Sequence, residues 1–338
     1  MFFASDNGAP VHPAVFAAME RANAGYALSY GNDVGTQGLR DRIRLIFEVP
    51  QAEVLLLTTG TAANALAISL LTPPWATTFC HRHAHIAEDE CGAPAFFSGG
   101  SALTLIDGTD GKIAPGPLTH AISQTGGSVH VAQRGALSLT NVTEAGTLYT
   151  PAEMSAVTAV ARAHHLPVHL DGARFANALA ATGATPADLS WRAGVDVLTL
   201  GGTKNGLMGA EAVVLFDPAK AWEGALRRKR AGHLNSKLRF VAAQFDAWFD
   251  GDLWLTLARH ANTMAARLAT GLAQVPGAEI LHPTPANIIF ARLPAAAHAR
   301  AKAAGAIYGQ SDDTMCRLVA SWSTTEGDVD GLLAAFRG

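Results

Sequence analysis

The chain has 338 residues, with 25 Lys and Arg against 28 Asp and Glu, which gives a formal net charge of −3 at pH 7. Hydrophobic residues make up 49% of it and charged residues 16%, a balance that excludes intrinsic disorder. The small negative charge argues against a nucleic-acid or membrane-surface partner. At ~100–200 residues per domain, the length predicts two domains or one large core with an appendage.

The sequence shows no signal for export or membrane insertion. The N-terminal residues lack a basic stretch and a long apolar core, and no run reaches the ~18 apolar residues of a membrane span. Cys80, Cys91 and Cys316 are too few for a disulfide framework and lack the paired spacing of a zinc or redox site. We therefore expect a soluble, cytoplasmic protein with buried or inert thiols. Its low charge density predicts that another subunit covers part of its surface.

Short apolar runs alternate with helical patterns along most of the chain. This alternation predicts an α/β fold with three layers, in which helices cover both faces of a mainly parallel sheet. The expected strands cover residues 54–57, 77–80, 103–106, 137–140, 168–171, 195–200 and 212–216. The expected helices cover residues 62–71, 151–165 and 219–230, and a capping box formed by Thr150 and Glu153 begins the second one.

The pattern changes near residue 235. The remaining expected elements are helices at 238–249, 253–273 and 328–336, and strands at 288–292 and 315–320. We expect a large domain from 15 to 235 and a smaller α+β domain from 236 to 338, with residues 1–14 packed at the junction between them.

A phosphate site is the first functional prediction. The strand at 54–57 is followed by Thr59-Gly60-Thr61-Ala62-Ala63-Asn64 and then by a helix. Free N–H groups and the positive end of the helix dipole bind anions at such a turn. The motif is neither a Walker loop nor a dinucleotide fingerprint, because it has no following lysine and only one glycine. An ordinary capped turn would show the same residues.

Two further signals follow strands of the same predicted sheet. Asp171 ends an apolar strand, and Arg174 comes three residues later. The two side chains either pair with each other or serve a ligand, with Asp171 at a protonated ring nitrogen and Arg174 at a carboxylate. Lys204 follows another apolar strand and two glycines, where burial and neighbouring cations would favour the neutral amine that Schiff-base chemistry needs. A surface lysine is the alternative.

Three histidines alternate along the chain after residue 80. If His81, His83 and His85 share one face of a strand, they could bind a transition metal. The other interpretation places only His85 in the site, as a flat ring stacked on an aromatic cofactor. A phosphate cradle, an acid, a stacking ring and a Schiff-base lysine together are the parts that pyridoxal 5′-phosphate requires. We therefore expect that cofactor and no metal.

The chain resembles the low-specificity L-threonine aldolases, a group with the aspartate-aminotransferase-like fold type I that includes phenylserine-cleaving members. The resemblance runs in order from residue 5 to residue 322. The motifs that carry it are Ser5-Asp6-Asn7, Tyr30-Gly31-Asn32-Asp33, Thr59-Gly60-Thr61-Ala62-Ala63-Asn64, Ala84-His85 with Glu90, His169-Leu170-Asp171-Gly172-Ala173-Arg174, Gly201-Gly202-Thr203-Lys204, and the strand from Cys316 to Trp322 with Arg317.

The resemblance implies a role for each of these residues. Lys204 binds the cofactor covalently, Asp171 pairs with the pyridinium, and His85 stacks on the ring. Gly60 and Thr61, with Ala62, hold the phosphate. Ser5, Arg174 and Arg317 clasp the substrate carboxylate. His130 falls where the family has a histidine near the β-hydroxyl and is the expected base, and Glu90 organises water or protons. Tyr30 and the basic run at 227–230 are expected to reach a neighbouring subunit's site, because such enzymes are dimers or dimers of dimers.

The implied reaction is carbon–carbon cleavage by an aldehyde-lyase. A β-hydroxy-α-amino acid such as L-threonine or L-allo-threonine would give glycine and an aldehyde. Transamination, β-elimination and hydroxymethyl transfer on the same fold remain alternatives, and a metal hydrolase built on the histidines is a more distant one. The chain departs from the family pattern after Ser138, where a histidine of some members is missing. Thr143 or Glu144 is expected to take over a polar role there.

Overall fold

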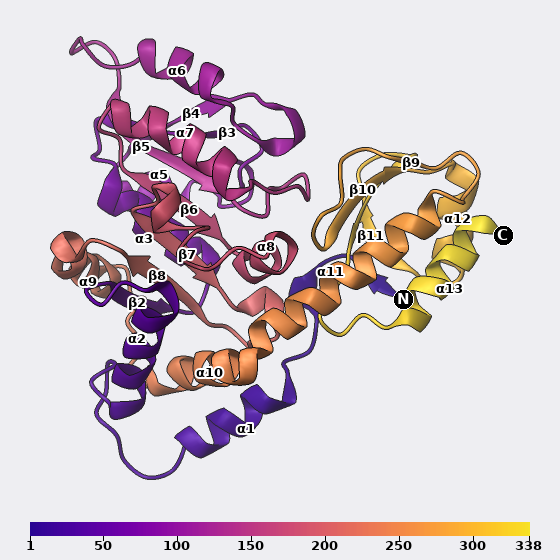
Figure 1. Ribbon diagram of the computed structural model, residues 1–338, viewed down its shortest axis with the longest axis horizontal. Helices are drawn as coiled ribbons and strands as arrows, with labels where there is room; N and C mark the ends of the chain where they lie inside the picture. The colour runs from indigo at the N-terminus through magenta and orange to yellow at the C-terminus, as the bar shows by residue number, and fades with distance from the viewer.

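A seven-stranded sheet forms the larger part of the molecule. The computed structural model describes residues 1–338, and Figure 1 shows this sheet separated from a smaller unit that holds both termini. The strand order is β2-β8-β7-β6-β5-β3-β4, and only β8 runs antiparallel to its neighbours. The strands are β2 (Glu53–Leu57), β3 (Ala76–His81), β4 (Ala102–Ile106), β5 (Gln133–Thr140), β6 (Val168–Gly172), β7 (Val197–Gly201) and β8 (Glu211–Leu215). The predicted mainly parallel α/β fold is confirmed.

Helices bury both faces of this sheet. In β2, Leu55 and Leu57 pack into the cluster that contains α3, while Val54 and Leu56 face the larger cluster on the opposite side. Strands buried on both faces read as continuous apolar runs, which is why the sequence showed no alternation here. The helices are α1 (Pro13–Ala22), α2 (Val34–Phe47), α3 (Gly60–Leu71), α4 (His85–Glu88), α5 (Ala93–Ser98), α6 (Pro115–Ser123), α7 (Pro151–Ala163), α8 (Phe175–Thr182), α9 (Ala221–Arg230) and α10 (Arg239–Phe249).

The smaller unit is built on a five-stranded sheet of order β1-β11-β12-β10-β9. Its strands are β1 (Phe2–Phe3), β9 (Glu279–Ile280), β10 (Ile288–Arg292), β11 (Ile307–Gln310) and β12 (Met315–Val319). Its helices are α11 (Leu253–Leu272), which runs between the two units in Figure 1, α12 (Ala295–Ala303) and α13 (Glu326–Arg337). A separate cluster of 19 buried residues forms its core. The N-terminus therefore joins the small sheet as a strand.

Packing continues past the expected domain boundary at 235. The core of the large unit includes most of α10 and the start of α11, as far as Ala258. The division at 235 stays a prediction, and the packing favours a boundary inside α11. The sequence analysis did not place α1, α2, α4, α5, α6, α8, α12 or the short strands β1, β9 and β11. No helix combines the length and the hydropathy needed to cross a membrane.

Candidate active site

A cavity of about 740 Å³ opens where the carboxyl ends of the central strands face the small sheet. Ligands bind at this edge of α/β sheets. The lining residues come from both units: Ser5, Asn7, His81, His83, His85, Glu88, Asp89, Gly108, Asp110, Gly111, Glu144, Ala145, Arg174, Lys204, Leu281, His282, Phe290, Met315 and Arg317. Five expected site residues therefore meet here: Ser5, His85, Arg174, Lys204 and Arg317.

Lys204 lies on a single helical turn, Thr203–Asn205, directly after β7. The glycines before it let the backbone pack closely, because a Cβ at Gly201 would lie 2.7 Å from the Cα of Ala173. The nearby guanidinium of Arg174, and then burial, lower the pKa of the Lys204 amine. The chain thus presents a buried amine that is biased toward its neutral, nucleophilic form.

Asp171 belongs to a buried polar chain that ends at His85. The amide of Asn64, on α3, donates to Asp171 Oδ2 at 2.8 Å and to Glu90 Oε1 at 2.8 Å. His85 Nδ1 lies 2.8 Å from the same oxygen of Glu90. Burial raises the pKa of Glu90, while the hydrogen bond that His85 donates to Glu90 raises the pKa of His85. The backbone N–H of Ala173 holds the other oxygen of Asp171 at 2.9 Å. The acid and the ring are thus fixed relative to each other.

Arg174 forms a buried ion pair with Asp6. Its Nε and Nη2 donate to the two carboxylate oxygens at 2.6 and 2.8 Å. Asn287, in the small unit, adds a third donor to Asp6 at 3.0 Å. Burial alone would raise the pKa of Asp6, but Arg174 outweighs it and lowers that pKa. The Nε–Nη2 edge of the guanidinium is therefore committed to Asp6, and Nη1 with the second N–H of Nη2 remains for a substrate carboxylate.

The start of α3 offers the expected anion site. Thr59 Oγ1 accepts from the N–H of Ala62 at 3.2 Å, whereas the N–H groups of Gly60 and Thr61 make no hydrogen bond. A Cβ at Gly60 would meet no atom within 4 Å, so the space beside this turn is open. Unpaired donors at the N-terminus of a 12-residue helix suit a phosphate.

Of the expected site residues, His130 and Tyr30 lie on the surface, away from this cavity. His130 lies on an exposed loop, where its N–H donates to Ser128 Oγ at 3.3 Å, and it does not line the cavity. Tyr30 is 44% exposed and lies outside the cavity, with Lys229 Nζ 5.0 Å from the centre of its ring. The structure thus gives no support to His130 as the base within this subunit, because its loop points to solvent.

The three histidines do not share a strand face, so the alternative of a metal site on such a face is wrong. β3 ends at His81, and His85 already begins α4. Each histidine has its own partner: the carbonyl of Gly108 for His81, Glu88 for His83 and Glu90 for His85. No group of three His, Cys, Asp or Glu side chains has the arrangement of a metal site.

The cysteines are free, and two of them, Cys80 and Cys316, are buried. Cys91 is exposed, because it follows the short helix α4 in a turn.

Sequence reasoning missed four residues of the site: Asp110, His282, Glu211 and, as a bridging amide, Asn64. Glu211, on β8, accepts a hydrogen bond from Thr203 Oγ1 at 2.5 Å, next to Lys204. Burial raises its pKa to about 7. A glutamate at the start of an otherwise apolar strand was the available signal for it. His282 and Asp110 come from segments without any motif.

Comparisons with known proteins show the family of this chain. A sequence model described as beta-eliminating lyase matches residues 3–295. The chain belongs to this family. Over 99% of its length it is 38% identical to a low-specificity L-threonine aldolase from a Pseudomonas species, of which it covers 96%. It is 41% identical over 95% of its length to the enzyme of that name from Pseudomonas aeruginosa, of which it covers 93%. These identities place the chain with the low-specificity L-threonine aldolases.

A solved structure of threonine aldolase from Leishmania major superimposes with a TM-score of 0.92 at 28% identity, covering 99% of this chain and 98% of that one. A structure named as a putative L-allo-threonine aldolase from Listeria monocytogenes gives 0.77 at 14% identity, covering 99% and 95%, and at that identity shows the fold alone. The family member is thus a fold type I protein, as the sequence predicted.

Proposed function

We propose that this protein is a pyridoxal phosphate-dependent aldolase that cleaves L-threonine, L-allo-threonine or a related β-hydroxy-α-amino acid to glycine and an aldehyde. The observation that carries the proposal is the meeting of a buried lysine, Lys204, with two arginines, Arg174 and Arg317, in one cavity of a chain from the threonine aldolase group. A carboxylate-binding wall beside a nucleophilic amine suits an amino-acid substrate.

The residues present fit the cofactor. The unpaired N–H groups of Gly60 and Thr61 would hold its phosphate, Asp171 its ring nitrogen, His85 its ring face and Lys204 its aldehyde carbon. The buried oxygen Glu90 Oε2 has no hydrogen-bond partner, so an acceptor remains free next to His85. When bound, the cofactor supplies an electron-poor ring that stabilises the electron pair left on Cα after the Cα–Cβ bond breaks.

Arg317 and the free Nη1 of Arg174 would orient the substrate through its carboxylate. Burial lowers the pKa of Arg317, and its Nη1 lies 3.5 Å from the carbonyl of Ala4, next to Ser5. Holding the carboxylate fixes which bond at Cα is aligned for cleavage, and such positioning accounts for a large share of catalysis. Glu144, one of the two residues expected to take over a polar role after Ser138, also lines this cavity.

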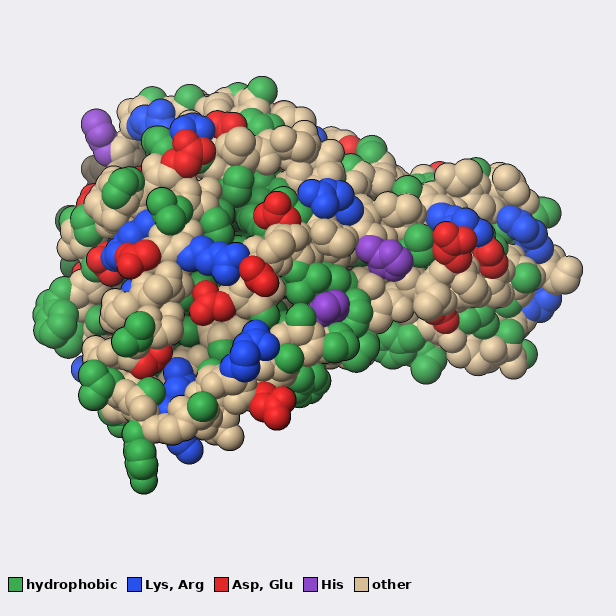
Figure 2. All heavy atoms as spheres, turned by 60° about the horizontal axis from the view of Figure 1, so that its bottom comes forward, with side chains coloured by type: hydrophobic (Ala, Val, Ile, Leu, Met, Phe, Trp, Pro, Cys, Tyr) green, Lys and Arg blue, Asp and Glu red, His purple; other side chains and the backbone are tan.

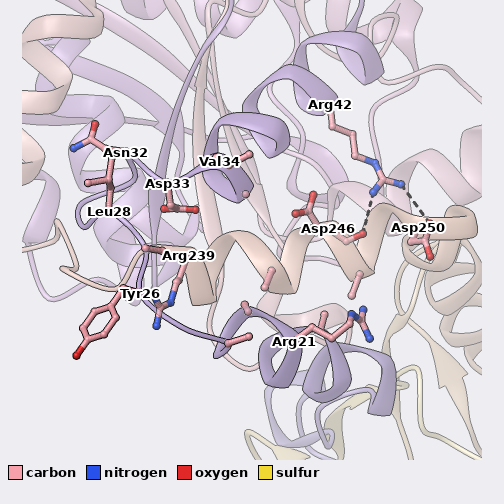
Figure 3. A pocket seen from close by; sticks show the side chains of 17 residues that line it. Arg21, Tyr26, Leu28, Asn32, Asp33, Val34, Arg42, Arg239, Asp246 and Asp250 are labelled. Carbon is pink, nitrogen blue, oxygen red and sulfur yellow. Dashed lines mark hydrogen bonds and ion pairs between the residues drawn. The ribbon is translucent and has the colours of Figure 1, made fainter.

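A homo-oligomer with shared sites is the assembly we propose. Large apolar side chains stand exposed beside a second hollow between α1, α2 and α10 (Figure 3), among them Tyr26, Leu28 and Val34. Figure 2 shows apolar side chains among the charged ones on the face that α1 and α10 share. Exposed apolar surface of this kind marks contacts between proteins. Tyr30 and the basic end of α9 would then reach a neighbouring site.

The free cysteines are the support for a cytoplasmic location, which we propose on that ground. We also propose two domains, with the first strand, β1, contributing to the small one.

The test is product analysis. Purified protein with added cofactor and L-allo-threonine should release acetaldehyde and glycine in equal amounts. Lys204→Ala should abolish this release together with the visible absorbance band of the bound cofactor. Formation of an α-keto acid without glycine would refute the aldolase function and favour transamination or elimination.

A further inference from the structure

The aldolase function needs a base at the β-hydroxyl, and His130 does not reach the cavity. We propose that His282, held by Asp110, accepts the β-hydroxyl proton. This inference rests on the proposed function and adds a catalytic residue to it. Both side chains line the cavity that contains Lys204, Arg174 and Arg317, and Asp110 comes from the large unit whereas His282 comes from the small one.

The geometry of the pair is that of an oriented imidazole. His282 Nδ1 lies 2.9 Å from Asp110 Oδ1, and Nε2 makes no hydrogen bond in the structure. A carboxylate at Nδ1 selects the tautomer in which Nε2 carries a lone pair, which is the form a general base needs. The ring also packs edge-on against Phe290, with centroids 5.9 Å apart. The side chains of His282 and Asp110 are 32% and 30% exposed, so protons can pass on to water.

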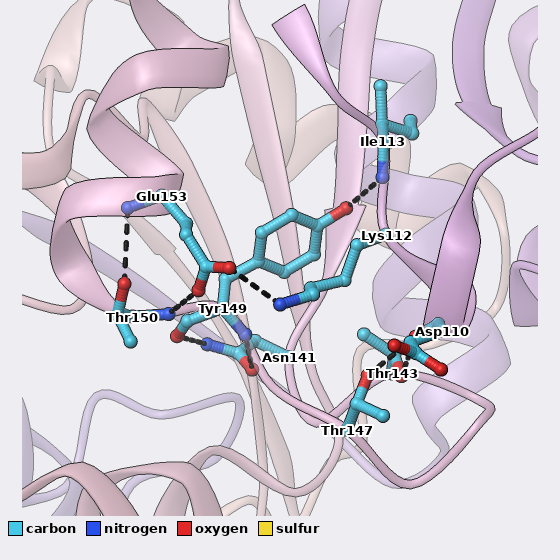
Figure 4. Close-up of polar contacts among 9 residues, drawn as sticks. All are labelled: Asp110, Lys112, Ile113, Asn141, Thr143, Thr147, Tyr149, Thr150 and Glu153. Carbon is cyan, nitrogen blue, oxygen red and sulfur yellow. Dashed lines mark hydrogen bonds and ion pairs between the residues drawn. The ribbon is translucent and has the colours of Figure 1, made fainter. Parts of the chain in front are cut away.

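Asp110 is itself firmly placed. It has a left-handed backbone conformation, with φ at 56°, which non-glycine residues adopt where their surroundings require it. Its carbonyl accepts hydrogen bonds from Thr143 Oγ1 at 3.3 Å and Thr147 Oγ1 at 2.5 Å, as Figure 4 shows. These contacts tie the loop that carries Asp110 to the loop that carries Glu144.

The same loop is anchored on its other side. The N–H of Ile113 donates to the hydroxyl of Tyr149 at 2.5 Å, and Lys112 pairs with Glu153 at 2.6 Å (Figure 4). The carboxylate of Asp110 therefore projects from a fixed backbone. Because His282 is hydrogen-bonded to this carboxylate, the position of its ring is fixed as well.

Other titratable groups of the cavity suit the role less well. His85 is bound to Glu90, within the chain that leads to Asp171. His83 pairs with Glu88 at 2.8 Å, but its side chain is 62% exposed, at the rim. Glu144 lines the same cavity and is the other candidate for the base. Its carboxylate makes no hydrogen bond that would orient it. His85 also has an orienting carboxylate and an Nε2 without a hydrogen bond, but the proposed function places its ring against the cofactor. Of the other cavity histidines, His282 combines an orienting carboxylate with a free Nε2 and a side chain that is 32% exposed, against 62% for His83.

The proposed step combines a proton transfer to His282 with cleavage of the Cα–Cβ bond. Nε2 of His282 takes the proton of the substrate's β-hydroxyl, and the O–H electron pair becomes the second bond of the aldehyde carbonyl. The Cα–Cβ bond breaks, and its electron pair stays on Cα with the stabilisation described above. A proton is then added at Cα to give glycine, and His282 returns its own proton to water.

The experiment compares two reactions of the holoenzyme. Cleavage of L-allo-threonine needs the base, whereas exchange of the Cα hydrogen of glycine in deuterium oxide, followed by NMR, has no hydroxyl to deprotonate. His282→Gln should lower kcat for cleavage by about 100-fold, within the range for loss of a general base, and leave glycine exchange within about threefold of wild type. Asp110→Asn should lower cleavage by about tenfold, since it removes only the orienting carboxylate.

His83→Gln is the matched control, because it removes another histidine that is paired with a carboxylate at the same cavity. It should leave both reactions within about threefold. A cleavage rate retained by His282→Gln would overturn the proposal, as would an equal loss of glycine exchange, which would mean that the pair merely holds the two units together. A large loss in Glu144→Gln with full activity in His282→Gln would assign the base to Glu144. Failure of the wild type to release glycine would instead refute the proposed function itself.

Discussion

Replacing Glu211 by Gln should stabilise the cofactor-free protein at pH 8 and change its stability little at pH 5. Glu211 is 4% exposed, and its Oε2 has no hydrogen-bond partner. Burial raises its pKa from 4.5 to about 7, although the hydrogen bond from Thr203 and the charge of Lys204 both act in the opposite direction. The folded protein therefore keeps a proton on this carboxyl at a pH where the unfolded chain has lost it.

The sign and size of the effect on the free energy of unfolding follow from this difference in pKa between the folded and unfolded states. Between pH 4.5 and about 7 the folded state binds more protons than the unfolded state, so the stability falls as the pH rises through this window. At ~1.4 kcal/mol for each pH unit, the cost above pH 7 reaches ~3 kcal/mol, whereas at pH 5 it is below ~1 kcal/mol. Gln keeps the acceptor for Thr203 and has no charge to bury, so it removes the pH-dependent part of the cost.

The assay is guanidinium unfolding of wild type and Glu211→Gln at both pH values and at one protein concentration, because assembly also affects stability. Glu20→Gln serves as a control: this exposed side chain makes no hydrogen bond or ion pair, and its replacement should leave the pH dependence as in wild type. The reasoning fails if the gain in stability from Glu211→Gln is the same at pH 5 and pH 8, or is larger at pH 5.

Three further outcomes are expected. Asp6→Asn should destabilise the protein by ~3–5 kcal/mol at pH 7, because it leaves the guanidinium of Arg174 buried without a countercharge. The pKa of Asp6 is lowered, so its contribution is present above pH ~4 and is lost as the pH falls, and the variant and wild type should converge in acid unfolding curves. Arg317→Ala should raise KM for amino acids by about tenfold or more while the cofactor content, read from the visible absorbance, stays near that of wild type; an equal loss of both would contradict a role in substrate binding. His130→Phe should leave kcat for cleavage within about twofold, since the side chain is on an exposed loop, and a tenfold loss would restore His130 as the base.

The sequence predicted those parts of the site that single strands carry. Lys204 and Asp171 each follow an apolar run at the carboxyl end of a strand, so their meeting follows from parallel strand order alone. The start of the helix at Gly60 was predicted equally well, because the turn and its cap are formed by residues adjacent in the sequence. The sequence therefore predicted the site residues whose positions depend only on one strand and the turn that follows it.

Contacts between distant segments could not be predicted in this way. Asp6 and Arg174 are 168 positions apart, and Asp110 and His282 are 172 apart. No local pattern relates such residues, and the motif around Arg174 could not show that Asp6 would occupy two of its nitrogens. His130 was predicted as the base from its place in the order of motifs, but it lies on a solvent-exposed loop. The helix α10 was predicted, but the sequence did not show that its apolar face packs into the core of the large unit.

The position of Asp6 also explains why substrate binding and the packing of the two units cannot be separated. Its carboxylate accepts from Arg174 of the large unit and from Asn287 of the small one, and Asn287 donates as well to the carbonyl of Ala320 at 2.8 Å. A shift of the small unit would therefore move the guanidinium of Arg174, together with Arg317 on β12, and both line the cavity. The second bridge, between Asp110 and His282, crosses the same cavity. Because carboxylate binding and proton acceptance both depend on residues bridging the units, a substitution that loosens their packing should lower affinity for the amino acid and the cleavage rate together.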